Sequence, residues 1–386
     1  MASLERSDLS VHIAAQAVEG TINATPAFKI IRGTSGIVQS TPTYVTSNEV
    51  ITDGQAAQQV QDRRESTLTR EFDVTKETIS LFNEVIHGTK SDNSSVASTT
   101  IAATATGFTV PTATATKLSV GDWFGMSGFA DASLNIRYKV ASKTSTTLTT
   151  TEAPATTESA GASVVLTSLK ASSDQNKTLR TIQNRITDLS KTGNVNFETY
   201  LDCFASVGSL TVDKSGIVTG SMEFKIPTPL DGTAAIAGQT DLAKDVSPVV
   251  SAVNNIGAFY ENGINSKCNI QTMSIEFNNN YEGDGGAAGC IDEKFGRGAI
   301  TVSGSVTART VKANSSIWRD KNRNGTTQAL AIEFKWGDEW AIMEVTNALI
   351  SSHEFTDGDI VVANSMEYSA SGTDETGKTF QIFSSF

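Results

Sequence analysis

Apolar and polar residues alternate through much of the second half of the chain, which is the pattern of half-buried β-strands. In residues 217–226, for example, Met222 and Phe224 share one face, whereas Glu223 and Lys225 share the other. The same alternation predicts further strands at Ile270–Phe277, Ile300–Thr307, Leu330–Trp336, Trp340–Thr346, Ile360–Ala363 and Phe380–Phe383. Predicted strands clearly outnumber predicted helices, so the pattern favours a mainly β protein.

A strand, a polar loop and a second strand are predicted in the first quarter of the chain. Thr43–Ile51 is rich in β-branched residues, and Ser66–Val74 alternates between apolar and polar positions. Between them, Gln55–Glu65 is almost wholly polar. Since this connection is much longer than a tight hairpin turn, we expect it to project and to reach another subunit.

One helix is predicted directly after this hairpin. Thr75 is a suitable N-cap, apolar residues recur at helical spacing from Ile79 to Ile86, and Gly88 is a natural stop. A second helix is possible near Ser247–Ile256. Leu179–Ile186 has apolar spacing that suits either a helix or a strand.

Residues 99–169 differ from the rest of the chain in being strongly enriched in Thr and Ala. Five short strands are predicted here, at Gly107–Val110, Trp123–Ser127, Tyr138–Ser142, Thr146–Thr150 and Ser163–Thr167. This spacing is typical of a small all-β domain, either Ig-like or SH3-like. We therefore expect a β-sandwich with one flanking helix, made of residues 1–98 and 170–386, and an inserted outer β domain at 99–169.

The chain is acidic, with a formal net charge of −12 and a pI near 4.8. Within residues 99–169 the charges cancel, because Lys117, Arg137, Lys139 and Lys143 balance Asp122, Asp131, Glu152 and Glu158. The net negative charge therefore belongs to the predicted sandwich. Such a charge argues against a protein that grips nucleic acid, because phosphate binding depends on Lys and Arg.

The three cysteines, Cys203, Cys268 and Cys290, are far apart and form no CxxC pair, so we expect buried free thiols. The N-terminus shows no apolar signal segment, and no apolar run approaches the roughly 20 residues that cross a membrane. The sequence therefore predicts a protein made in the cytoplasm, with no membrane partner.

Candidate catalytic and metal sites are weak. His12, His87 and His353 have no metal-binding spacing, and the glycine-rich segment 283–289 lacks the Lys of a phosphate-binding loop. Residues 320–325 have the Asp-x-Asn-x-Asn-Gly spacing of a calcium loop, with Asp320, Asn322 and Asn324 as candidate ligands. Ala331 stands where such a loop needs a bidentate carboxylate, so we predict a plain turn between strands and no cofactor.

Several segments resemble tail tube proteins of long-tailed bacteriophages. Thr25–Gly33, Ser47–Asp53 and Thr67–Gly88 resemble the opening of these proteins, and residues 99–169 resemble an extra β module that many of them carry. In that module the similar residues are Gly107-Phe108, Val120–Asp122, Ser127–Phe129, Tyr138–Val140, Thr147–Thr149 and Ala160–Ser163. Gly216–Phe224 and Ile275–Asn280 fit the same order of elements.

The resemblance implies a structural protein of the virion, not an enzyme. It implies six copies in a ring, rings stacked into a tube through which DNA passes without specific binding, and an acidic lumen. The implied partners are other copies of the chain, a tape measure protein inside the tube, and tail terminator and distal tail proteins at its ends. We expect assembly in the cytoplasm of the host bacterium. Because a projecting domain would obstruct a contractile sheath, we expect the non-contractile, siphovirus-type tail.

The resemblance also implies roles for individual residues. The hairpin loop would contact the next ring through Asp53, Gln55, Gln58, Arg63 and Arg64. Glu223, Glu276 and Glu333 lie opposite apolar strand faces and are candidates for the lumen or for contacts between subunits. An alternative function is a β-rich phage adhesin or fibre subunit that binds a host receptor, with Trp123 and Trp318 as exposed candidates.

Overall fold

The structure is a computed structural model that describes residues 9–34, 36–46, 59–86, 90–91, 95–161, 163–172, 178–187, 195–230, 234–266, 270–284, 294–309, 317–356, 363–370 and 379–386. Nineteen strands form one continuous sheet, seven form a second sheet, and two form a short ribbon. The prediction of a mainly β fold is confirmed. The described residues contain three α-helices where one was expected.

The large sheet folds back on itself at two strands of 18 residues each, β15 (Val195–Val212) and β26 (Glu339–Thr356). Each of these strands carries a non-glycine residue with positive φ at the bend, Asp202 (57°) in β15 and Asn347 (54°) in β26. Asp and Asn tolerate this conformation better than other side-chain residues do. The two halves of each strand can therefore join different layers of a sandwich.

Layer I contains the second halves of β15 and β26. Its other strands are β3 (Gln39–Thr46), β4 (Gln59–Asp73), β16 (Thr219–Lys225), β21 (Ile270–Asn278), β24 (Thr301–Arg309) and β27 (Ala363–Ala370). The strands pair in the order β3, β4, β16, β15, β21, β24, β27, β26, and every pairing is antiparallel.

Layer II contains the first halves of the two long strands in two groups. One group is β2 (Ala27–Ile30), β1 (Leu9–Ala15), β14 (Arg180–Thr187), β15 and β17 (Thr228–Leu230), with β18 (Thr240–Asp241) parallel to β2. The other is β20 (Ile264–Asn265), β19 (Ile256–Glu261), β25 (Thr327–Trp336), β26, β28 (Phe380–Ser384), β13 (Leu169–Ser172) and β5 (Lys90–Ser91). The prediction for 179–186 resolves as the strand β14.

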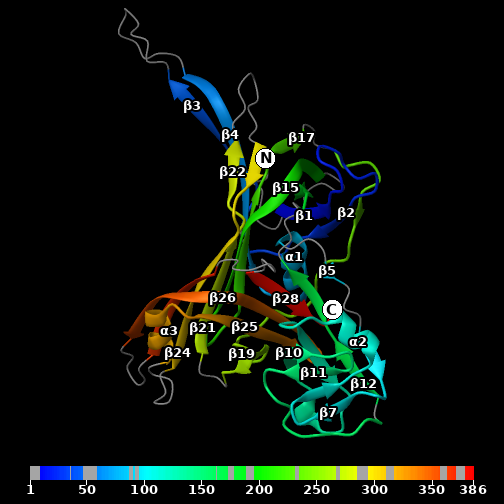
Figure 1. Cartoon of the computed structure of the whole chain (residues 1–386). Helices are drawn as coiled ribbons and strands as arrows, with labels where there is room; N and C mark the ends of the chain where they lie inside the picture. The colour runs from blue at the N-terminus through cyan, green and yellow to red at the C-terminus, as the bar shows by residue number, and fades with distance from the viewer. Residues whose placement is uncertain are drawn as a thin grey trace, which may run out of the picture.

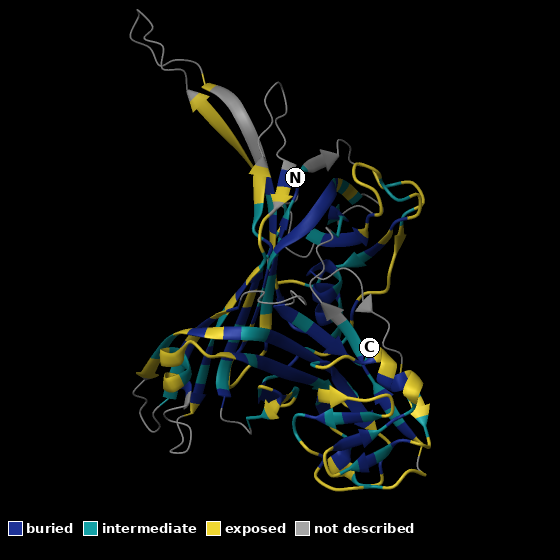
Figure 2. Ribbon diagram, viewed as in Figure 1, coloured by how far each residue is buried: buried dark blue, intermediate teal, exposed yellow. Residues whose placement is uncertain are grey.

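The main hydrophobic core fills the space between the layers. Met222 and Ile275 of layer I and Ile332 and Met343 of layer II belong to it, and all are at most 3% exposed. Figure 2 shows these strands as a continuous buried region. Helix α1 (Lys76–Ile86) also belongs to this core, and Thr75 caps it by accepting a hydrogen bond from the Thr78 N–H at 3.1 Å, as predicted.

Residues 96–167 form the second sheet, here called the module. Its strands pair in the order β6 (Val96–Ser98), β12 (Val164–Thr167), β9 (Trp123–Ser127), β10 (Arg137–Lys143), β11 (Thr147–Thr150), β8 (Gly107–Thr109) and β7 (Ala102–Thr104). The short helix α2 (Thr112–Lys117) and a turn of 3₁₀ helix (Ala132–Leu134) complete it. A separate apolar cluster, including Phe108, Phe124 and Tyr138, fills its interior. The module lies beside the strands of layer II (Figure 1).

Three expectations about local structure were wrong. The polar residues from Gln59 onward form the start of β4, because antiparallel pairing with β3 satisfies their backbone hydrogen bonds. The possible helix near 247–256 is an irregular segment ending in a turn. Residues 320–325 do not form a turn between strands, because Asp320 to Asn324 lie in helix α3 (Ile317–Asn324), which Gly325 follows with φ of +61°.

Candidate assembly surfaces

The hairpin of β3 and β4 extends beyond the sandwich as a two-stranded ribbon (Figure 1). Tyr44 and Val45 are adjacent in β3 and therefore point to opposite faces of the ribbon, yet each is 56% exposed. A ribbon of two strands has no core of its own and is marginally stable in water. Its exposed apolar side chains are therefore suited to contact with another molecule.

The predicted contact residues of this hairpin are only partly within the described structure. Arg63 and Arg64 lie in β4, opposite Thr43 and Pro42 of β3. Asp53, Gln55 and Gln58 lie outside the described residues, so their roles stay predictions.

The face of layer I that points away from the core is polar over six adjacent strands. Three parallel rows of side chains cross it, and each row is defined by the strand register. The rows are Glu71, Ser221, Ser209, Glu276, Ser303 and Ser369; Asp73, Thr219, Thr211, Ser274, Ser305 and Glu367; and Thr69, Glu223, Val207, Asn278 and Thr301. We call these rows the polar face.

The charges on the polar face are all negative. Its carboxylates belong to Glu71, Asp73, Glu223, Glu276 and Glu367. The three rows contain no Lys or Arg. On the same face of these strands, the nearest cations are Lys225, which pairs with Glu223 at 3.2 Å, and Arg309 at the end of β24, whereas Arg70 points to the other face of β4. Such a surface repels phosphate groups, so a nucleic acid beside it would not be held.

Hydroxyl groups on the polar face bond to one another across neighbouring strands. The Ser209 and Ser221 hydroxyl oxygens lie 2.8 Å apart, and those of Ser274 and Ser305 lie 2.9 Å apart. Cross-strand pairs of this kind stabilise a sheet that has one solvated side. The polar face is therefore a surface that the fold can leave in contact with water.

The module covers the opposite side of the sandwich. Trp123 of β9 packs with Tyr260, Trp340, Ile342 and Phe383, which belong to layer II. The rings of Trp123 and Tyr260 are 4.5 Å apart between centroids. The polar face and the module thus lie on opposite sides of the two layers.

Buried ion pairs also join the module to layer II. Arg137 of β10 lies 3.4 Å from Glu333, and Lys139 lies 2.5 Å from Glu344. Burial lowers the pKa of Arg137 and raises that of Glu344, and the partner charge opposes each shift. The Tyr260 hydroxyl donates a hydrogen bond to the Oε2 atom of Glu333 at 2.7 Å. A buried ion pair is stable only while both charges keep their positions, so these pairs constrain how the module lies on layer II.

The backbone of the module approaches the Trp340 indole closely at Gly125. A Cβ atom at Gly125 of β9 would lie 2.4 Å from the Trp340 Nε1 atom, so glycine is needed for the Trp340 ring to lie against the module. The Lys170 ammonium, directly beyond the module, pairs with Asp122 at 2.5 Å. The module is therefore held in a fixed position on layer II.

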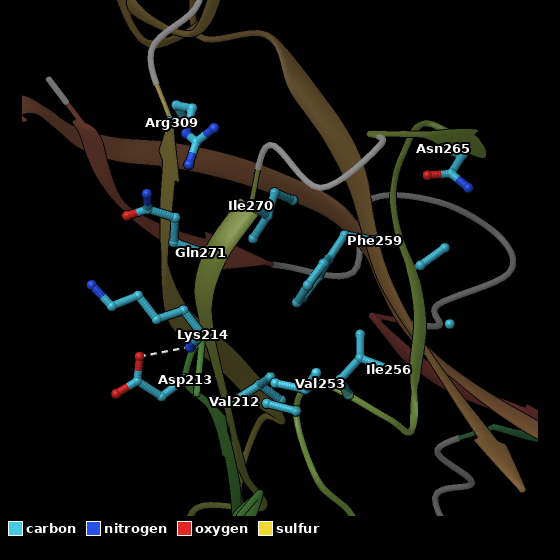
Figure 3. Close-up of a pocket in the computed structure, with 13 residues that line it drawn as sticks. Val212, Asp213, Lys214, Val253, Ile256, Phe259, Asn265, Ile270, Gln271 and Arg309 are labelled. Carbon is cyan, nitrogen blue, oxygen red and sulfur yellow. Dashed lines mark hydrogen bonds between the residues drawn. The ribbon is translucent and has the colours of Figure 1, made fainter. Parts of the chain in front are cut away.

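A cavity of about 630 Å³ lies where several strands of layer I end. Val212 of β15, Ile270 of β21, and Ile256 and Phe259 of β19 contribute its apolar wall, while Asp213 and Arg309 lie at its edge (Figure 3). Val212 is opposite Met273, one residue past the row of the polar face that contains Asp73. The cavity is thus at the end of the strands remote from the tip of the β3–β4 hairpin.

The three glutamates proposed for the lumen or for subunit contacts do not share a surface. Glu223 of β16 and Glu276 of β21 lie in adjacent rows of the polar face, with β15 between their strands. Glu333 does not, because it points outward from layer II and is only 2% exposed beneath the module. Glu333 does alternate with apolar residues as predicted, but no residue pattern indicates that Arg137 of the module covers it.

The candidate calcium ligands all lie in helix α3. The Asn322 amide donates to the Ile350 carbonyl oxygen at 2.8 Å, and Asp320 lies 3.6 Å from Arg319 at the surface. Within the described residues, no three His, Cys, Asp or Glu side chains gather closely enough to hold a metal ion. Cys203 is a buried free thiol whose pKa burial raises, while Cys268, Cys290 and His87 lie outside the described residues.

Sequence reasoning missed several residues of these surfaces. Glu71 lies in a predicted strand but was not proposed as a surface residue of the assembly. Glu367 lies in a segment for which no strand was predicted, although its neighbours Met366 and Tyr368 are apolar and alternate with it. Trp123 and Trp318, the candidates for an exposed receptor site, are 0% and 4% exposed. Their burial removes the two aromatic residues proposed as receptor contacts in the adhesin alternative.

Comparison with known proteins gives one clear match. A family profile described as phage tail tube protein matches residues 171–372, which is just over half of the chain. No curated protein resembles the chain closely enough to count as a match. None of the helices in the described ranges has the length and apolar character needed to cross a membrane.

Proposed function

This chain belongs to the phage tail tube protein family, and from that premise we propose that its copies assemble into stacked rings forming a non-contractile tail tube. The genome passes through this tube during ejection. The role is structural and requires no catalytic group. The resemblance implies that six copies of a β-sandwich with one helix form each ring, so the number of chains in a ring depends on how many such sandwiches a chain contains.

The observation that carries this proposal is the polar face. Its rows of Ser and Thr, with Glu71, Glu223 and Glu276 among them, suit the wall of a channel that DNA must cross without being held. Hydroxyl groups keep the wall hydrated, and carboxylates repel the phosphate backbone. Glu223 and Glu276 are therefore proposed as lumen residues.

The two sides of the sandwich then define the inside and the outside of the tube. If the polar face lines the channel, the module lies on the outer surface, because it is attached to layer II. A fixed outer module leaves no smooth surface along which a contractile sheath could lie. This arrangement supports a siphovirus-type tail without a sheath.

The two ends of the layer I strands support a head-to-tail stacking of rings. The β3–β4 hairpin projects at one end and the apolar cavity opens near the other (Figures 1 and 3). We propose that the hairpin contacts the next ring, with Asp53, Gln55, Gln58, Arg63 and Arg64 in or beside the contact. A tape measure protein would occupy the lumen, and tail terminator and distal tail proteins would bind the two ends. Assembly in the host cytoplasm is part of the same proposal.

Electron microscopy of the purified protein tests the function. Open rings with a central channel, or tubes built from them, are the expected result. Compact particles without a channel, both in the purified protein and in lysates of infected cells, would contradict a tube and return the adhesin alternative to consideration.

A further inference from the structure

The chain contains the same succession of elements twice. The first unit is β1, β2, β3, β4, α1, β14, β15, β16 and β17, and the second is β19, β20, β21, β24, α3, β25, β26, β27 and β28. Each strand pairing in the first unit has its counterpart in the second, for example β14 with β15 and β25 with β26, or β16 with β4 and β27 with β24. The module is inserted in the first unit only, between α1 and β14.

Irregular features recur at the same places in the two units. Asp202 and Asn347 have positive φ at the bends of β15 and β26. The register of β15 with β16 shifts between Ala205 and Val207, and that of β26 with β27 shifts between Ile350 and Ser352. Bulges mark single positions in a strand, so their coincidence aligns the units residue by residue.

Side chains agree with this alignment. Ser221-Met-Glu-Phe224 in β16 corresponds to Ser365-Met-Glu-Tyr368 in β27. Arg180 of β14 bonds to Glu84 of α1 at 3.0 Å, and Gln328 at the matching position of β25 accepts a bond from Lys321 of α3 at 2.7 Å. The two units are therefore a tandem repeat of one fold.

Within the chain, the units are joined by a pairing of β15 with β21. Ser209 lies opposite Glu276, and Leu210 opposite Ile275, with both apolar residues 3% exposed. The counterpart of β15 is β26, and the counterpart of β21 is β3. Each of these two is an edge of layer I in the described structure, since β3 pairs only with β4, and residues 350–356 of β26 pair only with β27.

An apolar residue on the edge of β26 is exposed to solvent in the single chain. Phe355 is the counterpart of Leu210, yet it is 50% exposed. Val38, just before β3, is the counterpart of Ile275, and the adjacent Ile37 is 45% exposed. Strand edges with exposed apolar side chains are surfaces for pairing with another chain.

We propose that the β26 edge of one copy pairs with the β3 edge of a second copy in the register of β15 with β21, and that three copies close a ring. This inference rests on the proposed tube function and specifies its subunit joint. The alignment places Ser352 opposite Thr41 of the next copy, Glu354 opposite Gln39, and Phe355 opposite Val38. Two units per chain make six units per ring from three chains.

The joint continues the polar face across the boundary between copies. Each copy supplies eight strands of layer I, from β3 to β26, and three copies close these into one barrel. Barrels of roughly 16–18 strands already leave an aqueous channel, so a larger closed barrel leaves room for a wider one. A head-to-tail contact that closes also removes both exposed edges.

Disulfide cross-linking in assembled tubes tests the register. The variant Gln39→Cys with Glu354→Cys should form disulfides between copies on mild oxidation, because opposed strand residues have Cβ atoms about 4.5–5.5 Å apart. The matched control, Ser209→Cys with Glu276→Cys, places the same geometry inside one chain and should cross-link without changing the mass of the chain. Tyr44→Cys with Glu354→Cys is out of register and should remain reduced.

The size of the cross-linked product tests the ring. On denaturing gels, Gln39→Cys with Glu354→Cys should give a ladder that ends at three chains. A ladder ending at six chains would overturn the three-chain ring, and tubes without any cross-link would overturn the register, while both results would leave the tube function standing. Failure of the unmodified protein to form rings or tubes would instead contradict the proposed function.

A second measurement covers the case in which the cysteine variants do not assemble. The mass per ring of unmodified tubes should correspond to three chains, and a mass of six chains would overturn the proposal.

Phe355→Asp should leave monomers folded but prevent rings, whereas Val253→Asp, at a 72% exposed site away from the joint, should still form them. Normal rings from Phe355→Asp would overturn the joint.

Discussion

Lys139 of the module and Glu344 of layer II form an ion pair of 2.5 Å in which the side chains are 14% and 1% exposed. This pair and the pair of Arg137 with Glu333 lie side by side on β10, so one strand of the module provides both cations. Trp123 lies against the same junction, with its ring 6.0 Å from the Lys139 ammonium. The junction therefore combines apolar packing with two ion pairs, and each ion pair needs both of its charges.

Removing one partner of the Lys139 and Glu344 pair should destabilise the protein strongly. Lys139→Met leaves the Glu344 carboxylate buried without its cation, a change that costs about 3–5 kcal/mol in buried pairs. Thermal unfolding at neutral pH should show this loss. The double variant Lys139→Met with Glu344→Met removes both charges and should recover most of the stability, and a double variant as unstable as the single one would contradict this account.

The same variant should show a characteristic pH dependence. Burial raises the pKa of Glu344, and Lys139 opposes that rise, so Lys139→Met should raise the pKa further. A carboxyl with a raised pKa contributes stability that is present at low pH and is lost as the pH rises through that pKa. The deficit of Lys139→Met should therefore be smaller at pH 5 than at pH 8, whereas an equal deficit would contradict a charged Glu344 as its cause.

His12 should make the folded protein sensitive to acid. Burial, with a further contribution from the Arg185 guanidinium, lowers the pKa of His12 from 6.5 to about 4. Its Nδ1 atom is buried without a hydrogen-bond partner in the described structure. Because the unfolded chain binds this proton more readily, stability should be lost as the pH falls from 6.5 towards 4.

The variant His12→Gln isolates this effect. Urea unfolding at several pH values should show a smaller loss of stability for His12→Gln than for the unmodified protein between pH 6.5 and 4. Parallel curves for the two proteins over this range would contradict the assignment. Hydrogen bonds from the Arg185 guanidinium hold the pKa of the Asp241 carboxyl, which faces the same site, below its ordinary value.

Much of the fold follows from residue patterns because strands with one buried face impose a period of two. The predicted Trp123–Ser127 coincides with β9, and the strands near residues 270, 301 and 380 begin within a residue of their predicted starts. Patterning failed where burial did not impose the period. The start of β4 is polar on both faces, and the bends of β15 and β26 depend on backbone conformation at Asp202 and Asn347.

The candidate surfaces were harder to predict because they depend on which elements meet. Glu276 and Glu333 have the same sequence pattern, yet one lies on the polar face and the other beneath the module. Their difference comes from the position of Arg137, which is nearly two hundred residues from Glu333 in the chain. The repeat of Ser-Met-Glu at residues 221 and 365 was present in the sequence, but a match of so few residues acquires meaning only when the strand registers coincide.

Charge reversal on the polar face should convert a passive channel into one that binds DNA. Glu71 and Glu276 are exposed and lie in one row, so Glu71→Lys with Glu276→Lys should preserve the fold and the assembly. Tubes of this variant should retain short DNA fragments in a manner that weakens steeply with salt. Glu71→Gln with Glu276→Gln is the neutral control and should not retain DNA.

A filter-retention assay on assembled tubes measures this difference. Equal retention by the Lys variant and the unmodified tubes would place these residues away from the lumen. Such an outcome would contradict the assignment of the polar face while leaving the family membership unchanged.

The hairpin of β3 and β4 leads to the last prediction. Arg63 and Arg64 lie in β4, opposite Thr43 and Pro42 of β3, in the hairpin that projects beyond the sandwich. If these arginines bridge stacked rings, Arg63→Glu with Arg64→Glu should leave the circular dichroism and the unfolding temperature of the monomer unchanged, because the substitutions keep the backbone pairing of β3 with β4. Rings should still form, since the joint between β26 and β3 lies at residues 37–41, but rings should fail to stack. Arg63→Lys with Arg64→Lys keeps the charge and should restore tubes, and electron microscopy separates the three states. Tubes of normal length from the Glu variant would show that Arg63 and Arg64 make no stacking contact. The contact between rings would then have to be sought at the cavity end of the strands.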